Sequence, residues 1–150
     1  MSNQRALYQQ VILDHNKSPR NFGVMEDPDC QAEGYNALCG DQFRVYLRIK
    51  DGTIEAVQFD GSGCAISKSS ASIMTTLLKG KTREEAKLLF DNFKGMITSN
   101  PGASFDAKEL GKLIVFSGVR EFHIRVKCAT LAWHTLLAAL KGEADTVSTE

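Results

Sequence analysis

The sequence has no excess of charge of either sign, because eighteen lysines and arginines balance eighteen aspartates and glutamates. A general nucleic-acid or anionic-membrane binder usually carries a basic excess, so this balance argues against both classes of partner. No apolar run approaches the roughly 20 residues that a membrane helix needs. The first ten residues are polar and lack the apolar core of a signal peptide, so we expect a cytoplasmic location.

The chain also lacks any Cys-x-x-Cys pair, although it contains four cysteines. This absence argues against an ordinary zinc finger, whose ligands come in such pairs. Disulfides mainly stabilise small domains in oxidising compartments, whereas 150 residues can bury a core without them. In a reducing compartment, spaced cysteines point to metal binding, to catalysis or to plain core filling.

Hydrophobic periodicity predicts both helices and strands. A helix is expected over residues 4–16, and the stretch 18–38, with its prolines and glycines, is expected to be irregular. Residues 43–49 and 54–59 alternate like half-buried strands around the hairpin signal Asp51-Gly52, and a change of phase in the second strand predicts a bulge. Further helices are expected over residues 67–79, 82–95, 106–118 and 126–141.

An early hairpin followed by helices predicts an α+β fold, in which helices cover one face of a small antiparallel sheet. Ser67 is expected to cap the helix over 67–79, and Thr82 with Glu85 forms a capping-box pattern. Residues 1–142 are expected to form a single domain, followed by a flexible acidic C-terminal tail over 143–150.

Three cysteines lie in settings that suit a thiolate. In extended chain Cys39 and Asp41 point to the same side, so that sulfur and carboxylate can converge on one ion. Cys64 lies between the return strand and a helix start, where the helix dipole favours negative charge. Cys128 is expected in the first turn of the last helix, beside the cations Arg125 and Lys127.

Each setting alone also fits a small buried cysteine, in a turn or under a helix. Taken together, three sulfurs and one carboxylate provide four donors of the type and number that suit tetrahedral zinc. A carboxylate is the least typical ligand of a purely structural zinc site, so Asp41 and the flexible Gly40 indicate a site whose coordination can change. Cys30, in a polar stretch, and His15, at a helix edge, are taken as residues without a chemical role.

Three segments resemble the motifs of the IscU-like iron–sulfur cluster assembly proteins, a family that includes NifU N-terminal domains. They are Leu38-Cys39-Gly40-Asp41, residues 61–67 (GSGCAIS) and residues 125–133 (RVKCATLAW). The resemblance runs from Tyr8 through Lys141 and is strongest to the SufU-type branch. Lys127 stands where the scaffold branch carries a histidine, and residues 82–118 can contain the extra segment of the SufU type. Ala37 departs from the proline that the family commonly has before Cys-Gly-Asp.

This resemblance implies an IscU/SufE-like fold and zinc held by Cys39, Asp41, Cys64 and Cys128. It also implies a SufS-type, pyridoxal-phosphate-dependent cysteine desulfurase as partner, with downstream iron–sulfur assembly proteins after it. In the SufU-type mechanism a histidine of the desulfurase displaces Cys39 from zinc, and Cys39, the catalytic residue, then accepts the persulfide sulfur. The protein is then a sulfurtransferase that acts as acceptor or activator of the desulfurase.

Two cationic residues near the four proposed zinc donors, Arg125 and Lys127, are also assigned functions. Arg125 matches a position that contacts the desulfurase, with a solvated helix-start charge as the alternative. Lys127 is expected to give the thiolates electrostatic support.

Three other functions stay open at this stage. The same four donors can hold a transient iron–sulfur cluster, as in a scaffold, although Lys127 replaces a histidine donor. Zinc can serve only as a structural element of an interaction module. A cysteine–histidine hydrolase using His123 or His134 is a further class, but neither histidine has an orienting acid near it in sequence.

Overall fold

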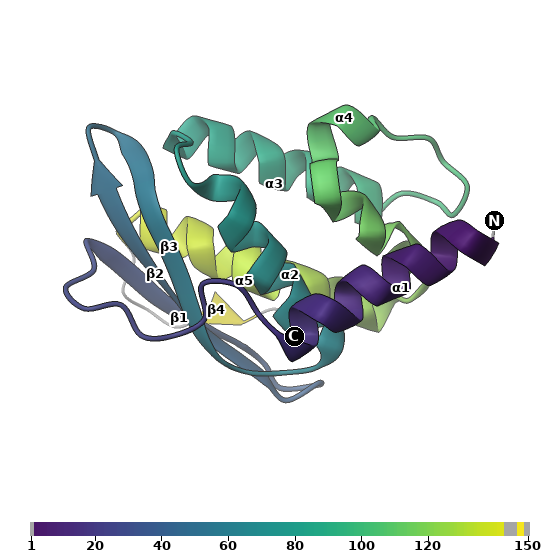
Figure 1. Cartoon of the computed structure of the whole chain (residues 1–150), viewed down its shortest axis with the longest axis horizontal. Coiled ribbons are helices and arrows are strands. Elements are labelled where there is room, and N and C mark those ends of the chain that lie inside the picture. Colours follow the sequence, from purple (N-terminus) through teal and green to yellow (C-terminus); the bar gives the residue numbers. More distant parts are fainter. Residues whose placement is uncertain (1, 143–146, 149–150) are drawn as a thin grey trace.

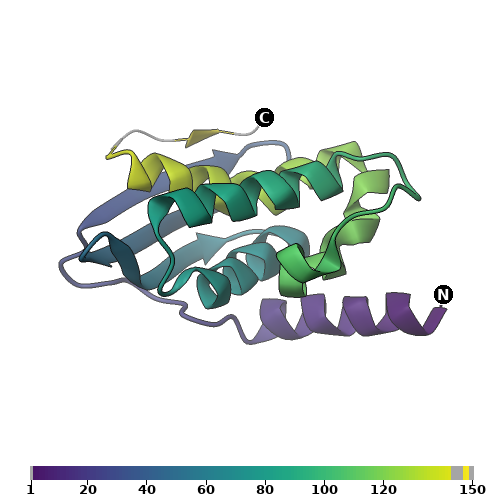
Figure 2. The ribbon, with the colours of Figure 1, turned by 90° about the horizontal axis from the view of Figure 1, so that it is seen from above.

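The computed structural model describes residues 2–142 and 147–148, and Figures 1 and 2 show it from two directions. The first half of the chain forms α1 (Ser2–Lys17), β1 (Cys30–Asn36), β2 (Asp41–Lys50), β3 (Thr53–Ser62) and α2 (Ala65–Leu78). The second half forms α3 (Arg83–Ile97), α4 (Ala107–Leu110), the 3₁₀ helix η1 (Gly111–Glu121), α5 (His123–Leu140) and β4 (Val147–Ser148). No helix in these described ranges is both long enough and apolar enough to cross a membrane.

The predicted α+β fold is confirmed. Within the described residues the strand order is β3-β2-β1-β4, and β1, β2 and β3 are antiparallel neighbours. Asp51 and Gly52 both have positive φ, of 53° and 77°, as the predicted hairpin turn requires. The predicted bulge also exists, because Arg48 pairs with Ala56 while Ile49 pairs with Ile54.

Strand β1 corrects the expectation of an irregular segment over residues 18–38. The inward-facing positions of this strand are Ala32, Gly34 and Asn36, all of them buried. These side chains are small or polar, so the strand has no alternating apolar pattern that sequence periodicity can detect. Cys30 begins the strand and packs against the core, in place of the polar loop that was expected.

The sequence predicted which segments form helices better than it predicted where each helix begins and ends. Cys64, not Ser67, is the N-cap of α2, and its sulfur accepts the Ser67 N–H at 3.5 Å. The capping box of Thr82 and Glu85 on α3 is confirmed. The helix expected over 106–118 is the short α4 followed by η1.

Helix α5 begins three residues earlier than predicted, at His123. As a result Cys128 lies in the second turn of the helix rather than the first. The tail expected over 143–150 lies outside the described residues except for β4, a strand that was not predicted. Val147 of β4 pairs in parallel with Gly34 of β1.

The helices cover one face of the sheet, as Figure 1 shows, with the strands along one side of the molecule. Helix α5 packs on β1 and β2, and α2 packs beside α5 and on β3. The fully buried Trp133 of α5 stacks on Phe90 of α3, and its indole N–H donates to Ser70 Oγ of α2 at 3.2 Å. Ser70 in turn donates to the Ala129 carbonyl at 2.6 Å, so α2 and α5 are joined by polar as well as apolar contacts.

The close packing of α5 on β1 leads to a stability prediction for Gly34. A Cβ at Gly34 would lie far inside contact distance of Thr135 Oγ1 and 3.2 Å from Leu131. We therefore expect Gly34→Ala to lower the free energy of unfolding by about 1–3 kcal/mol, measured by urea denaturation.

Gly95→Ala is the matched control, because Gly95 lies in α3 and a Cβ there meets nothing within 4 Å. This substitution is expected to raise stability by up to about 0.5–1 kcal/mol, since alanine favours helix more than glycine does. Equal stability of the two variants contradicts the described packing of α5 on β1.

Candidate metal centre

Turns and helix starts at one end of the sheet carry the candidate donors. Cys39 lies in the turn between β1 and β2, where Gly40 has a φ of 72° that favours glycine, and Asp41 is the first residue of β2. Because Gln42 pairs with Ser62, the end of β3 brings Cys64 next to Asp41. Helix α5, lying across β1 and β2, adds Cys128.

Three of the four predicted donors lie within ligand distance of one another. In the described part of the chain, the ligand atoms of Cys39, Asp41 and Cys128 are all within 4.8 Å of each other. The sulfurs of Cys39 and Cys128 are 3.0 Å apart. Cys64 joins the group differently: its backbone N–H donates to Asp41 Oδ1 at 2.9 Å, and its sulfur shares a hydrogen bond with Cys128.

Asp41 provides the test of whether these residues suit a metal ion. Its side chain is 1% exposed, and Oδ1 accepts the Cys64 N–H. Oδ2 is the one buried side-chain oxygen or nitrogen without a hydrogen-bond partner among the described residues. An unpartnered buried carboxylate oxygen is costly, and a bound cation removes that cost.

Gly63 leaves the space in which the Asp41 carboxylate lies. A Cβ at this position would be 2.7 Å from Asp41 Oδ1 and 2.9 Å from Phe43. The donor chemistry agrees with the geometry, because three thiols and one carboxylate suit zinc. The residues present therefore fit a zinc ion.

The thiols differ in acidity because they share hydrogen bonds. The pKa of Cys64 is lowered to about 5, chiefly by a hydrogen bond from Cys128 and further by the N–H and hydroxyl of Ser67. The pKa of Cys128 is raised, because its proton is shared with Cys64 and the thiol is buried. Within this group Cys64 is thus more acidic than Cys128.

Arg125 lies on the exposed start of α5, close to the sulfurs. Its pKa is raised by a hydrogen bond to Cys128 and by the charges of Cys64 and Cys128. Sequence reasoning assigned Arg125 to a partner and Lys127 to the support of thiolates. Arg125 interacts electrostatically with the sulfurs, and Lys127 is an exposed neighbour of Cys128; both roles stay predictions.

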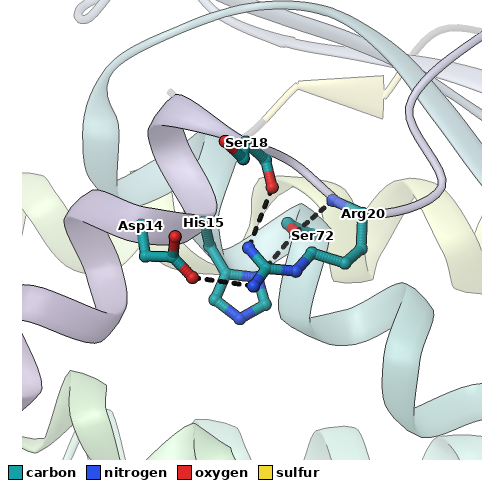
Figure 3. Close-up of polar contacts among 5 residues, drawn as sticks. All are labelled: Asp14, His15, Ser18, Arg20 and Ser72. Atoms are coloured by element: carbon teal, nitrogen blue, oxygen red, sulfur yellow. Dashed lines mark hydrogen bonds and ion pairs between the residues drawn. The ribbon is translucent and has the colours of Figure 1, made fainter.

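His15 has a structural role. His15 is 2% exposed, and its Nδ1 lies 2.7 Å from Ser72 Oγ, which also accepts the backbone N–H of Arg20 (Figure 3). Arg20 in turn forms an ion pair with Asp14 at 2.7 Å. His15 therefore ties α1 to α2.

His123 and His134, the candidates for hydrolase chemistry, both lie on α5. His123 is exposed at the first residue of the helix, and the His134 ring packs edge-on against Phe90. Burial lowers the pKa of His134.

Asn36 was not foreseen as a residue of this site. It is fully buried, and its Nδ2 donates to Cys128 Sγ over 3.8 Å. In the sequence Asn36 stands among glycines and polar residues, where asparagine usually indicates a turn. Its place three residues before Cys39 was the signal that was available.

Comparison with known proteins identifies the family. The model of the NifU-like N terminal domain matches residues 7–141. The chain belongs to this family. It is 40% identical over 136 residues to the zinc-dependent sulfurtransferase SufU of Bacillus subtilis, covering 90% of each chain. It is 36% identical over 137 residues to the iron–sulfur cluster assembly scaffold protein IscU of Thermotoga maritima, covering 91% of this chain and 94% of that protein.

Solved structures of the family have the same fold. A crystal structure from Fervidobacterium islandicum AW-1, described as an iron–sulfur cluster assembly scaffold protein for the SUF system, matches with a TM-score of 0.81 and 37% identity. The match covers 87% of this chain and 94% of that one. The predicted family membership and IscU-like fold are confirmed.

The acidity of Cys64 generates a pH prediction for the zinc-free protein. Because a lowered pKa keeps the thiolate present down to about pH 5, alkylation of Cys64 by iodoacetamide should reach half its maximal rate near that pH. Peptide mass spectrometry across a pH series measures this profile at Cys64 alone. Cys128→Ala should move the midpoint upward, and Ser67→Ala should move it less, since Cys128 is the larger cause. A midpoint that neither substitution moves contradicts the described hydrogen bonds.

Proposed function

We propose that this protein is a zinc-dependent sulfur-transfer protein of iron–sulfur cluster assembly. Cys39, Asp41, Cys64 and Cys128 hold the zinc, and Cys39 accepts sulfur from a SufS-type cysteine desulfurase. The similarity to Bacillus subtilis SufU supports the sulfur-transfer activity, and the unpartnered Asp41 oxygen among thiols supports the metal.

The observation that carries the proposal is the unequal burial of the donors. Asp41 and Cys128 are each 1% exposed and belong to β2 and α5. Cys39 is partly exposed in a short turn, beside Leu38, which is 64% exposed. Cys64 is also partly exposed, but it caps α2, where its sulfur accepts the Ser67 N–H. A partner can reach Cys39 and not Cys128, and Cys39 lies in a turn outside regular structure, so Cys39 is the donor suited to exchange sulfur.

The transfer is a thiol–persulfide exchange. The Cys39 thiolate attacks the terminal sulfur of the desulfurase persulfide, and a new sulfur–sulfur bond forms on Cys39. The bond between that sulfur and the desulfurase cysteine breaks, and the desulfurase thiolate leaves with the electron pair. The number of electrons is unchanged, so no external oxidant or reductant is needed.

When bound, zinc holds cysteine sulfur as thiolate and protects it from oxidation. Arg125, exposed near the sulfurs, is proposed to contact the desulfurase and to attract its persulfide anion toward Cys39. Lys127 adds a second positive charge on the same turn of α5.

A scaffold function is the second candidate, favoured by the similarity to Thermotoga maritima IscU. The same four donors then hold a transient iron–sulfur cluster. Lys127 precedes Cys128 and cannot act as the histidine donor that the scaffold branch carries at this position. Metal content separates the two candidates: colourless protein with one zinc per chain supports transfer, and brown protein after anaerobic isolation supports the scaffold.

The proposed acceptor is tested with a SufS-type desulfurase and L-cysteine. We expect the protein to accelerate desulfuration and to carry a persulfide on Cys39, detected by mass spectrometry. Cys39→Ala should reduce the rate to that of the desulfurase alone, because the accepting thiol is missing.

Cys30→Ala is the matched control for this assay. Cys30 begins β1, whereas Asn36 ends it beside the site, so Cys30 lies about 20 Å from the donors. This variant should behave like the unaltered protein. Full acceleration by Cys39→Ala would overturn the acceptor assignment. Acceleration by the unaltered protein without any persulfide on Cys39 identifies an activator instead.

A further inference from the structure

Asn36 is a fully buried polar residue that the proposed transfer does not use. It ends β1 and pairs directly with Asp41 of β2 across the turn that carries Cys39. A buried amide is retained at such a position only where hydrogen bonds offset its desolvation. Its contacts therefore indicate what it does.

Besides its place in the sheet, Asn36 makes hydrogen bonds to both thiol-bearing segments. Its side-chain Oδ1 accepts the N–H of Leu38 at 3.2 Å, and its main-chain carbonyl accepts the N–H of Cys39 at 3.3 Å. Its Nδ2 donates toward Cys128 Sγ at 3.8 Å. One residue thus connects the turn that carries Cys39 with the helix that carries Cys128.

The turn itself offers little else to fix its shape. Ala37 does not restrict the backbone as a proline does, and Gly40, with a φ of 72°, accepts conformations that other residues avoid. Ala37, Leu38 and Gly40 are also exposed, so core packing does not hold them.

We propose that Asn36 is a positioning residue that holds the Cys39 thiol against Cys128. The inference deepens the proposed function and rests on it for its purpose, because the placement of Cys39 decides both its place among the donors and its access to a partner. Asn36 acts through the turn that carries Cys39 and through its hydrogen bond to Cys128.

The geometry can be measured without metal or desulfurase. In zinc-free protein, diamide accepts two electrons and two protons from a pair of thiols and leaves a disulfide. Cys128 faces both Cys39 and Cys64, so two linkages compete for one sulfur. Peptide mass spectrometry gives the initial rate of each linkage.

We expect the Cys39–Cys128 linkage to form at least about fivefold more slowly in Asn36→Ala, because the reacting sulfurs are no longer held together. The Cys64–Cys128 linkage should stay within about twofold of its rate in the unaltered protein, because Cys64 is placed by α2. A general loss of structure changes both rates together, so the ratio separates positioning from stability.

Two further variants complete the design. Thr75→Val removes a buried hydroxyl bonded to the Ser72 carbonyl, about three turns along α2 from Cys64, and should leave the ratio unchanged. Asn36→Asp keeps the acceptor for the Leu38 N–H but loses the donor to Cys128. Hydrogen exchange over residues 37–41 should therefore be about tenfold faster in Asn36→Ala and nearly unchanged in Asn36→Asp.

An unchanged linkage ratio in Asn36→Ala overturns the inference, as does a change of the same size in Thr75→Val. If Asn36→Ala does not fold, equal exchange over residues 37–41 in Asn36→Asp and the unaltered protein supports the acceptor contact, and faster exchange in Asn36→Asp contradicts it. The disulfide assay needs neither zinc nor a desulfurase, so the two proposals fail separately. If Asn36→Ala loses sulfur transfer while its ratio of Cys39–Cys128 to Cys64–Cys128 linkage is unchanged, the positioning role of Asn36 is contradicted and the proposed function is not.

Discussion

The packing of α5 against both the sheet and α2 is the constraint on which the candidate site depends. Ser70 accepts the Trp133 N–H and donates to the Ala129 carbonyl, which fixes α5 relative to α2. Cys64 caps α2 and Cys128 lies on α5, one residue before Ala129. Donors that are far apart in sequence therefore meet because two helices are locked together, and no short ligand motif is required.

Three of the four donors are held in or beside regular structure and one lies in a turn, and this difference suits sulfur transfer. Asp41 and Cys128 are buried in regular structure, and Cys64 is held by the first turn of α2. Cys39 lies in an exposed turn, where a conformational change costs little core packing. Such a set can keep a metal on three firm donors while the fourth exchanges partners. Asn36 sets the resting place of that fourth donor.

Local signals in the sequence predicted the fold well, while features that depend on tertiary contacts were missed. The hairpin at Asp51-Gly52 and the capping box of α3 follow from residues close in sequence. Strand β1 was missed because α5 covers its inward face, which allows glycine and asparagine there. The donor set rested on residue types and family resemblance. The structure groups Cys39, Asp41 and Cys128 as expected, whereas the hydrogen bonds that distinguish the thiols require coordinates.

The most direct test of the central claim is X-ray absorption at the zinc edge on the protein as purified. A site built from Cys39, Asp41, Cys64 and Cys128 predicts three sulfur scatterers at about 2.3 Å and one oxygen at about 2.0–2.2 Å. In Asp41→Ala the three sulfurs should remain and the oxygen of the carboxylate should be replaced or lost. Zinc surrounded by fewer than three sulfurs, or a spectrum that Asp41→Ala leaves unchanged, would contradict the proposed four-donor centre.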